Sequence, residues 1–265
     1  MRMVIKLGGS ILENAETRAS LLRQIAELHA QGSEIILVHG GGKILSRRLG
    51  QLGIQSRFVD GLRITDEATL GVALMVLAGE VNKSLVMELA GCGVRPMGLC
   101  GADGLAVRCA RASDLPGFPS GLGYVGKPMG TNRRVFDLLL AEGMIPVVAS
   151  IAVGDDFQAY NVNADQMASV CAWSTGCQSL VFLTDVAGVL DAGGAVLSRL
   201  CSTDIRRLRE EGVIAAGMLP KTESCLEALA GGVSSVYILP GSAPDILRKF
   251  ISGKLTEGTI INAAA

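Results

Sequence analysis

The sequence has 265 residues, of which 49% are hydrophobic, 18% charged and 4% aromatic, and its formal net charge is -1. This length and apolar content predict a well-packed globular chain and exclude a disordered one. The near-neutral charge and the scarcity of aromatic rings argue against a nucleic-acid partner, because phosphate backbones attract basic surfaces and bases stack on aromatic side chains.

Strand-like runs of Val, Ile and Leu alternate with amphipathic helical segments. We expect strands at Met3–Leu7, Glu34–His39, Arg95–Leu99, Ile145–Ala149, Ser179–Thr184 and Ser235–Leu239. We expect helices at Leu21–Gln31, Val135–Glu142, Gln166–Trp173, Ile205–Glu211 and Thr222–Ala230. The alternation predicts an α/β fold with a largely parallel central sheet, covered by helices on both faces. Ligands then belong at the carboxyl ends of the strands, and the turn-rich and polar residues 154–166 mark a cleft between two lobes.

The first two strands both end in glycines, at residues 6–10 (Lys-Leu-Gly-Gly-Ser) and 39–43 (His-Gly-Gly-Gly-Lys). Bare backbone N–H groups at a strand end, followed by a helix start, bind anions. Two such turns side by side predict two anionic ligands.

Two lysines stand next to glycine-containing turns. An isolated strand-end lysine such as Lys6 would extend its amine to solvent, but the N–H donors of Gly8 and Gly9 favour a cation that faces phosphate. Lys221 opens the Thr222–Ala230 helix. Taken alone it is a solvated residue at a helix start, and only a weak indication of function.

Polar residues cluster before two further helical patterns. Asn161, Asn163 and Asp165 occupy alternate positions before Gln166, and three such groups exceed what one helix cap requires. Arg63 precedes a helix that Thr65 could cap, and a guanidinium can hold a small acidic substrate through two hydrogen bonds. Surface arginines are nevertheless common.

Residues 184–190 end a buried strand with Asp185 and a turn. That carboxylate could bind a ribose or a ligand amine, or it could cap the turn, and the spacing favours neither. Residues 121–127 approach a dinucleotide fingerprint and a P-loop. Pro116 and Pro119 replace the required strand, however, and Pro128 replaces the required Ser or Thr, so we expect a glycine-rich hairpin or loop.

No membrane span or secretory core is expected. The longest strongly apolar stretch, 144–153, is far shorter than the roughly 18 residues of a span, and Lys6 and Gly8 interrupt the N-terminal apolar run. The seven cysteines are odd in number and form no Cys-x-x-Cys pair, which favours reduced side chains. We therefore expect a cytoplasmic protein that ligates no metal of its own.

Taken together, these motifs resemble the amino-acid kinase family, and within it the acetylglutamate branch. The similar segments are IKLGGS at 5–10, VHGGGK at 38–43, GLRIT at 61–65, LAGEVNKSL at 77–85, YNVNADQ at 160–166, LTDVAGVL at 183–190 and GMLPK at 217–221. The first two are typical of the superfamily, whereas GLRIT and YNVNADQ indicate the branch.

The resemblance implies a single domain with a three-layer amino-acid kinase fold and two lobes around the cleft. Residues of about 1–175 would bind the acyl amino acid and dimerise, and those of about 176–265 would bind ATP. The implied activity is phosphorylation of the side-chain carboxylate of N-acetyl-L-glutamate by ATP in arginine biosynthesis, with Mg²⁺ carried by the ATP. The alternatives are a kinase for another acyl amino acid, such as N-succinylglutamate or an aminoadipate derivative, or for uridylate, and a non-catalytic binding protein.

The resemblance also implies roles for individual residues. Lys6 and Lys221 would stabilise the transferring phosphoryl group, and Asp165 would hold both lysines. The residues implied for the acyl amino acid are Gly41, Gly42, Arg63, Asn161 and Asn163. The residues implied for the nucleotide are Gly8, Gly9, Asp185, Val186, Ala187, Gly188, Val189, Leu190, Val213, Ile214 and Ala215.

This chain departs from the family pattern in two places. Residues 114–132 are unusually rich in Gly and Pro, which leaves the preferred acyl group open. Arginine-inhibited relatives carry an extra N-terminal helix through which dimers form hexamers, whereas here the first strand begins at about Met3. We therefore expect a homodimer without arginine feedback.

Overall fold

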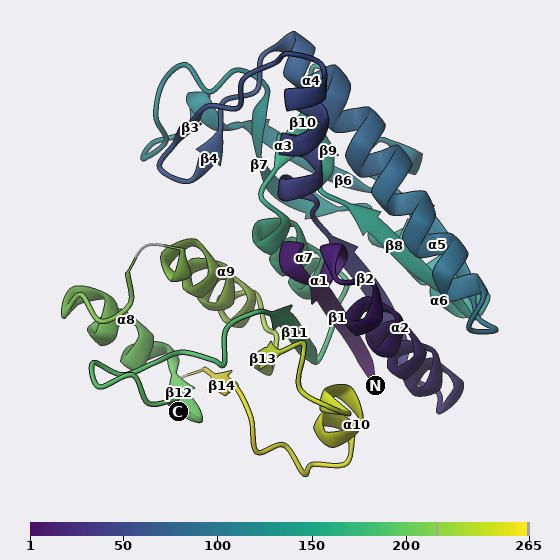
Figure 1. Ribbon diagram of the computed structural model, residues 1–265, viewed down its shortest axis with the longest axis vertical. Helices are drawn as coiled ribbons and strands as arrows, with labels where there is room; N and C mark the ends of the chain where they lie inside the picture. Colours follow the sequence, from purple (N-terminus) through teal and green to yellow (C-terminus); the bar gives the residue numbers. More distant parts are fainter. Residues whose placement is uncertain (216, 264–265) are drawn as a thin grey trace.

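An eight-stranded sheet forms the middle layer of the computed structural model, which describes residues 1–215 and 217–263 (Figure 1). The strand order is β12-β14-β13-β11-β1-β2-β8-β5. The strands are β1 (Arg2–Leu7), β2 (Glu34–His39), β5 (Arg95–Leu99), β8 (Met144–Ala149), β11 (Ser179–Thr184), β12 (Arg199–Cys201), β13 (Ser235–Pro240) and β14 (Thr259–Asn262). Neighbouring strands are parallel except β13 and β14. The predicted parallel sheet is confirmed, and all six predicted strands lie within one residue of their expected ends.

Side chains of the central strands alternate between two hydrophobic cores. Met3 and Ile5 of β1 belong to one core, whereas Val4 points to the opposite face and belongs to the other. Because successive residues of a strand face opposite sides, a run of apolar residues requires cover on both faces. The sheet therefore has a helical layer on each side.

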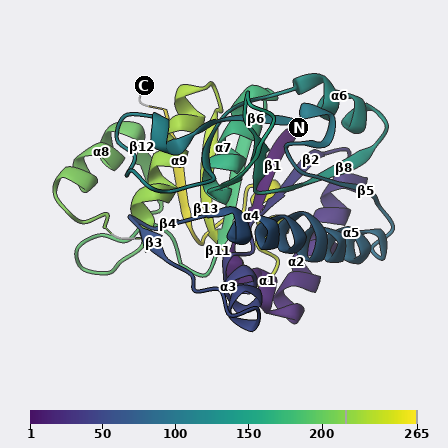
Figure 2. The ribbon, with the colours of Figure 1, turned by 90° about the horizontal axis from the view of Figure 1, so that it is seen from above.

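Figure 2 shows these two helical layers on opposite sides of the sheet. One layer holds α1 (Gly9–Glu13), α2 (Ala15–Ala30), α3 (Gly42–Gln51), α4 (Glu67–Ala73), η1 (Leu74–Val81), α5 (Asn82–Ala90) and α10 (Ile246–Ile251). The other holds α6 (Arg133–Ala141), α7 (Ala164–Ser174), α8 (Ser202–Glu210) and α9 (Met218–Ala230). The predicted helices are all present. Each begins two to six residues before its predicted start.

Four shorter strands close into a small barrel beyond the main sheet: β6 (Val107–Arg111), β7 (Val125–Thr131), β9 (Ile151–Val153) and β10 (Ala159–Val162). Short 3-10 turns, η2 (Asp103–Leu105) and η3 (Ala112–Asp114), flank β6, and a hairpin of β3 (Phe58–Val59) and β4 (Leu62–Arg63) lies nearby. The glycine-rich hairpin or loop expected around residues 121–127 is a strand from Val125 onward, where β7 begins. That strand pairs with β6 and also with β10, where Val125 lies opposite Asn161, 36 residues further along the chain.

Segments α4, η1 and α5 form one helix, Glu67–Ala90, of 24 residues. Its length and its mean hydropathy of 1.5 would suffice to cross a membrane, whereas sequence analysis expected a helix here but no apolar stretch of that length. Leu77 and Leu85 lie in the hydrophobic core, which accounts for much of this apolar composition, since a core helix passes the same test. The expectation that Thr65 caps this helix is wrong. Asp66 accepts the hydrogen bond from the Thr69 backbone N–H at 2.8 Å, because its side chain reaches the first turn.

Candidate active site

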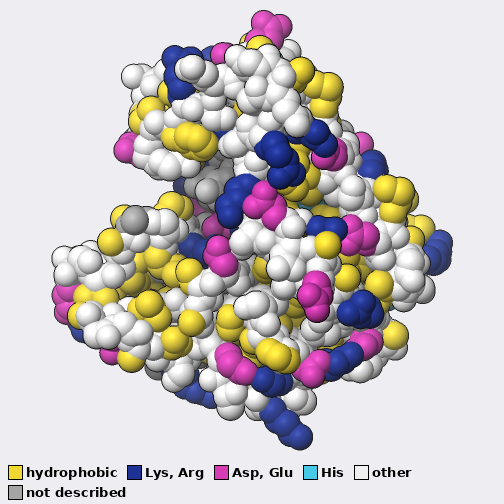
Figure 3. All heavy atoms as spheres, viewed as in Figure 1, with side chains coloured by type: hydrophobic (Ala, Val, Ile, Leu, Met, Phe, Trp, Pro, Cys, Tyr) yellow, Lys and Arg dark blue, Asp and Glu magenta, His cyan; other side chains and the backbone are white. Residues whose placement is uncertain are grey.

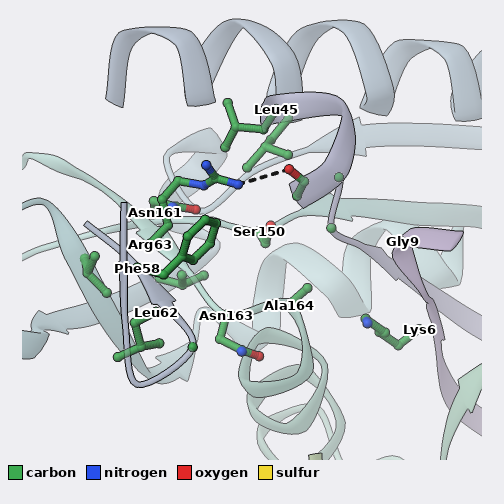
Figure 4. A pocket seen from close by; sticks show the side chains of 17 residues that line it. Lys6, Gly9, Leu45, Phe58, Leu62, Arg63, Ser150, Asn161, Asn163 and Ala164 are labelled. Atoms are coloured by element: carbon green, nitrogen blue, oxygen red, sulfur yellow. Dashed lines mark hydrogen bonds between the residues drawn. The ribbon is translucent and has the colours of Figure 1, made fainter. Parts of the chain in front are cut away.

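A pocket of about 230 Å³ opens at the carboxyl ends of β1 and β2. Figure 3 shows the surrounding cleft as a hollow between the part that carries β3 and β4 and the part that carries α8 and α9. Figure 4 shows Lys6 at one end of the pocket and Arg63 with Phe58 at the other. The residues predicted from sequence that line this pocket are Lys6, Gly9, Gly41, Gly42, Arg63, Asn161 and Asn163.

Asp165 lies between the two lysines that sequence analysis singled out. Lys221 Nζ donates a hydrogen bond to Asp165 Oδ2 at 2.9 Å. Lys6 Nζ lies 2.8 Å from Oδ1 as an ion pair outside hydrogen-bond geometry. All three side chains are 10–13% exposed. The fold thus joins the end of β1, the start of α7 and the start of α9 through one carboxylate.

Burial and charge act in opposite directions on this cluster. Burial alone would raise the pKa of Asp165, but the ammonium groups of Lys6 and Lys221 hold it well below its ordinary value. Burial lowers the pKa of Lys6, and Asp165 counteracts that effect. The cluster therefore carries one negative and two positive charges, and its net positive charge faces the cleft.

The three polar residues before α7 have different local roles. Asn163 is the helix cap, because its Oδ1 accepts hydrogen bonds from the backbone N–H groups of Asp165 at 2.8 Å and Gln166 at 3.3 Å. Asn161 Nδ2 donates to Thr65 Oγ1 at 3.2 Å, from β10 to the residue before α4. The two groups beyond the helix cap thus have other partners: Asp165 belongs to the lysine cluster, and Asn161 contacts the far side of the pocket.

Arg63 is held by the second glycine turn and by two serines. Its Nη2 donates to the Gly42 carbonyl at 3.0 Å and to Ser46 Oγ at 2.8 Å, while Nη1 donates to Ser56 Oγ. The guanidinium carbon lies 4.6 Å from the centre of the Phe58 ring. Of its five N–H donors, the Nε–H and one Nη1–H have no acceptor among the described residues. Both remain free for a carboxylate.

The second glycine turn requires glycine at position 41. Gly41 has φ +153°, and a Cβ there would lie 2.8 Å from Leu77 Cδ2. A side chain would therefore be strained by the backbone and would collide with η1. The close approach places the turn against the long helix.

The residues implied for the nucleotide lie along the other side of the cleft. Gly8 N–H donates to the Leu183 carbonyl at 2.8 Å, which joins the ends of β1 and β11. After β11, Asp185 is exposed and Thr184 Oγ1 donates to its Oδ1 at 3.2 Å. Val186, Ala187 and Leu190 are exposed, as is Ala215, the last residue before the undescribed Ala216.

Other residues implied for the nucleotide have side chains that pack into the hydrophobic core. Val189 and Ile214 are 1% and 3% exposed and belong to the hydrophobic core, and Val213 packs against it. Gly188 is buried, and the Val189 N–H donates to Thr259 Oγ1 at 2.8 Å. Any ligand would meet Val189 and Ile214 through backbone atoms.

Sequence reasoning missed several residues that shape the pocket. Ser46 and Ser56 orient Arg63, and Phe58 covers its guanidinium. Ser150 and Leu77 line the pocket wall. No local pattern marks these residues, because their positions depend on contacts between distant segments.

Comparison with known proteins agrees with this architecture. A sequence profile described as the Amino acid kinase family matches residues 1–240. The chain belongs to the amino acid kinase family. Among similar family proteins, the acetylglutamate kinase of Acidobacterium capsulatum is 45% identical over 264 residues, which is 100% of both chains. The acetylglutamate kinase of Koribacter versatilis is 43% identical over 259 residues, 98% of each.

A solved structure of this amino acid kinase fold is also similar over the whole chain. The N-acetylglutamate synthase of Neisseria gonorrhoeae, complexed with coenzyme A and N-acetyl-glutamate, superposes with a TM-score of 0.85 at 26% identity. The match covers 100% of this chain and 60% of the synthase chain. The remaining two fifths of the synthase chain have no counterpart in this chain.

Proposed function

We propose that this protein is an acetylglutamate kinase that transfers the γ-phosphoryl group of ATP to the side-chain carboxylate of N-acetyl-L-glutamate, as a step of arginine biosynthesis in the cytoplasm. The observation that carries the proposal is the pocket itself, which has Lys6 at one end, joined through Asp165 to Lys221, and the free donors of Arg63 at the other. The full-length similarity to acetylglutamate kinases supports this choice of substrate.

The reaction needs no general base from the protein. A glutamate side-chain carboxylate has a reference pKa of about 4.3 and is already ionised at neutral pH. Its oxygen attacks the γ-phosphorus, the bond from that phosphorus to the bridging oxygen breaks, and ADP leaves with the electron pair. The obstacle is repulsion between the carboxylate and the triphosphate, together with charge on the equatorial phosphoryl oxygens.

The buried lysines address that obstacle. Lys6 and Lys221 would stabilise the transferring phosphoryl group, while Asp165 fixes their positions and balances one of their charges. Gly9 would meet the nucleotide phosphates through its backbone N–H, whereas the expectation of a bare N–H at Gly8 is wrong, because that group donates to the Leu183 carbonyl. The segments 185–190 and 213–215 would meet the rest of the nucleotide. Mg²⁺ would enter bound to the ATP phosphates as part of the substrate.

The opposite end of the pocket suits the acyl amino acid. One of the two free donors of Arg63, the Nε–H or the second Nη1–H, would hold the α-carboxylate. Asn161 and Asn163 would bind the remaining polar atoms, and Gly41 and Gly42 would bring their backbone to the reacting carboxylate. Residues of about 1–175 would thus bind the acyl amino acid, and those of about 176–265 would bind ATP.

Exposed methionines support our further proposal that the protein is a homodimer. Met75 and Met87 on the long helix are 61% and 66% exposed, and Met97 on the edge strand β5 is 42% exposed. Unpaired apolar side chains at a sheet edge favour contact with another chain. Sedimentation analysis should give twice the 27.5 kDa mass of one chain.

Hydroxylamine trapping tests the activity, because it converts an acyl phosphate to a hydroxamate. We expect an ATP-dependent hydroxamate signal with N-acetyl-L-glutamate. The same assay with N-succinylglutamate, free glutamate, N-acetylaspartate and UMP tests which acceptor the enzyme prefers. Lys6→Ala and Lys221→Ala should each lower kcat by about 10²- to 10³-fold. Lys43→Ala is the matched control, since Lys43 adjoins the glycine turn but is 65% exposed. Absence of signal with every acyl glutamate, or wild-type turnover in either lysine variant, would refute the proposal.

A further inference from the structure

The segment 77–85, Leu-Ala-Gly-Glu-Val-Asn-Lys-Ser-Leu, places a buried amide behind the second glycine turn. Asn82 is 0% exposed, and its Nδ2 donates to His39 Nε2 at 3.0 Å and to the Val147 carbonyl at 2.8 Å. Its Oδ1 accepts from Lys83 Nζ at 3.1 Å. The amide is thus fixed by contacts to two adjacent strands, β2 and β8.

His39 passes this restraint to the glycine turn. Its Nδ1 lies 2.8 Å from the Gly40 carbonyl oxygen, which can only accept, so Nδ1 carries the proton. Nε2 is then unprotonated and accepts from Asn82, which selects one neutral tautomer of the fully buried ring. The contacts run in one direction, from Asn82 through His39 to the Gly40 carbonyl.

The restraint decides which way the Gly40–Gly41 peptide faces. The described residues contain no cis peptide bond, and in a trans peptide the C=O and N–H point in opposite directions. Because the Gly40 carbonyl faces buried His39, the Gly41 N–H faces away from the core, toward the cleft that both glycines line. That N–H has no acceptor among the described residues.

A peptide between two glycines needs such a restraint. Neither Gly40 nor Gly41 has a Cβ to oppose rotation, so the peptide can flip at little steric cost. After a flip, the Gly40 carbonyl would face the anion in the cleft and repel it. The His39 ring opposes this flip, because its Nδ1–H donates to the Gly40 carbonyl from the core side and so keeps the Gly41 N–H directed toward the cleft.

The helix geometry supports the same alignment. η1 is a π-helix that ends at Val81, directly before Asn82, and it packs Leu77 and Val81 against the position of a Gly41 side chain. π-helical turns are rare and often occur at functional sites. Here the wide turns bring the helix against the glycine turn and direct Asn82 toward His39.

We propose that Asn82 and His39 are positioning residues that hold the Gly41 N–H toward the acyl amino acid. The inference rests on the proposed function for the identity of that ligand. Neither side chain touches the substrate, so both act through the orientation of one peptide bond.

Steady-state kinetics separate this role from general destabilisation. Asn82→Ala and His39→Gln should each raise KM for N-acetyl-L-glutamate about tenfold, as expected for loss of one hydrogen bond to a charged group, and leave KM for ATP within about twofold. His39→Asn should recover most of the affinity, because its amide N–H replaces Nδ1, whereas Gln extends to the position of Nε2. Equal changes in both KM values, or no recovery in His39→Asn, would overturn the proposal.

A glycine on the edge strand offers a test distant from the cleft. A Cβ on Gly98 would lie 2.1 Å from Asn82 Oδ1 and 2.8 Å from Lys83 Nζ, so Gly98→Ala should displace the amide and reproduce the Asn82→Ala kinetics. Gly130→Ala is the matched control, because it lies on a strand and its Cβ would meet nothing within 4 Å. Wild-type kinetics in a folded Gly98→Ala protein would contradict the inference.

Nitrogen NMR of the histidine side chains gives a readout that does not depend on the substrate. The chain has only two histidines, so His39 can be assigned by the His39→Asn variant. We expect the Nδ1–H tautomer in the wild type and its loss in Asn82→Ala. An Nε2–H tautomer in the wild type would overturn the positioning role. Failure of every acyl glutamate in the trapping assay, with the Nδ1–H tautomer present, would refute the proposed function alone.

Discussion

Replacement of His39 by Gln should remove a large part of the acid sensitivity of this protein between pH 7 and pH 5. The pKa of His39 is lowered from 6.5 to about 4, chiefly by burial and also by the charges of Lys6 and Lys83, while the hydrogen bond to the Gly40 carbonyl opposes the shift. The unfolded chain therefore binds a proton at a pH where the native ring does not. Stability contributed by the neutral ring is present above about pH 6.5 and is lost as the pH falls toward 4.

The magnitude follows from the difference in proton affinity. A tenfold difference is worth about 1.4 kcal/mol, so the full shift in the pKa of His39 corresponds to about 3 kcal/mol. Between pH 7 and pH 5 the wild type should lose about 2 kcal/mol of unfolding free energy from this residue, before most carboxylates titrate. His39→Gln, which has no titratable ring, should lose little over that interval.

Urea unfolding at the two pH values measures this difference. Trp173, the single tryptophan, lies half-buried at the end of α7 and reports unfolding by fluorescence, with circular dichroism as a second probe. His29→Gln is the control, because His29 is the other histidine and is only half-buried. If His39→Gln retained the wild-type loss of about 2 kcal/mol, burial of a neutral His39 would not be its source.

Two further substitutions test the buried polar groups of α7. Asp165→Asn should lower the unfolding free energy by about 3–5 kcal/mol at pH 7, because Lys6 and Lys221 lose their buried counter-charge. Part of that loss should return at higher pH, because burial lowers the pKa of Lys6 and the native state therefore loses the Lys6 proton before the unfolded state does. Thermal unfolding at neutral and at alkaline pH measures the two losses. An equal loss of stability at both pH values would contradict the prediction. Ser169→Ala should be neutral or stabilising by up to about 1 kcal/mol, because the buried Ser169 hydroxyl has no hydrogen-bond partner among the described residues. A clear loss of stability in urea unfolding would indicate an ordered partner for that hydroxyl.

The local pattern of the sequence determined the central part of the fold. Apolar runs such as Glu34–His39 specify strands covered on both faces, and the glycines after them specify turns that expose backbone donors. The small barrel escaped sequence analysis, because β7 lies in a Gly- and Pro-rich segment and is stabilised by pairing with β6 and β10. The 24-residue helix was expected after Thr65, but its bounds and its cap at Asp66 were not predicted.

The same division applies to the candidate site. Residue type and spacing made Lys6 and Asp165 candidates, because a lysine beside a glycine turn and an excess of polar groups at a helix start are visible along the chain. Lys221 and Arg63 were only weak candidates, and their roles were implied by the family resemblance. Only the tertiary structure brings Lys221 within 2.9 Å of Asp165, 56 residues away.

Tertiary structure alone also decides how the second glycine turn is held. It seats Asn82 against His39, 43 residues away, and draws the Gly40 carbonyl toward the core. Sequence fixes which donors are present at a strand end. Their direction depends on the groups packed behind them, and those groups come from segments that meet only after the chain has folded.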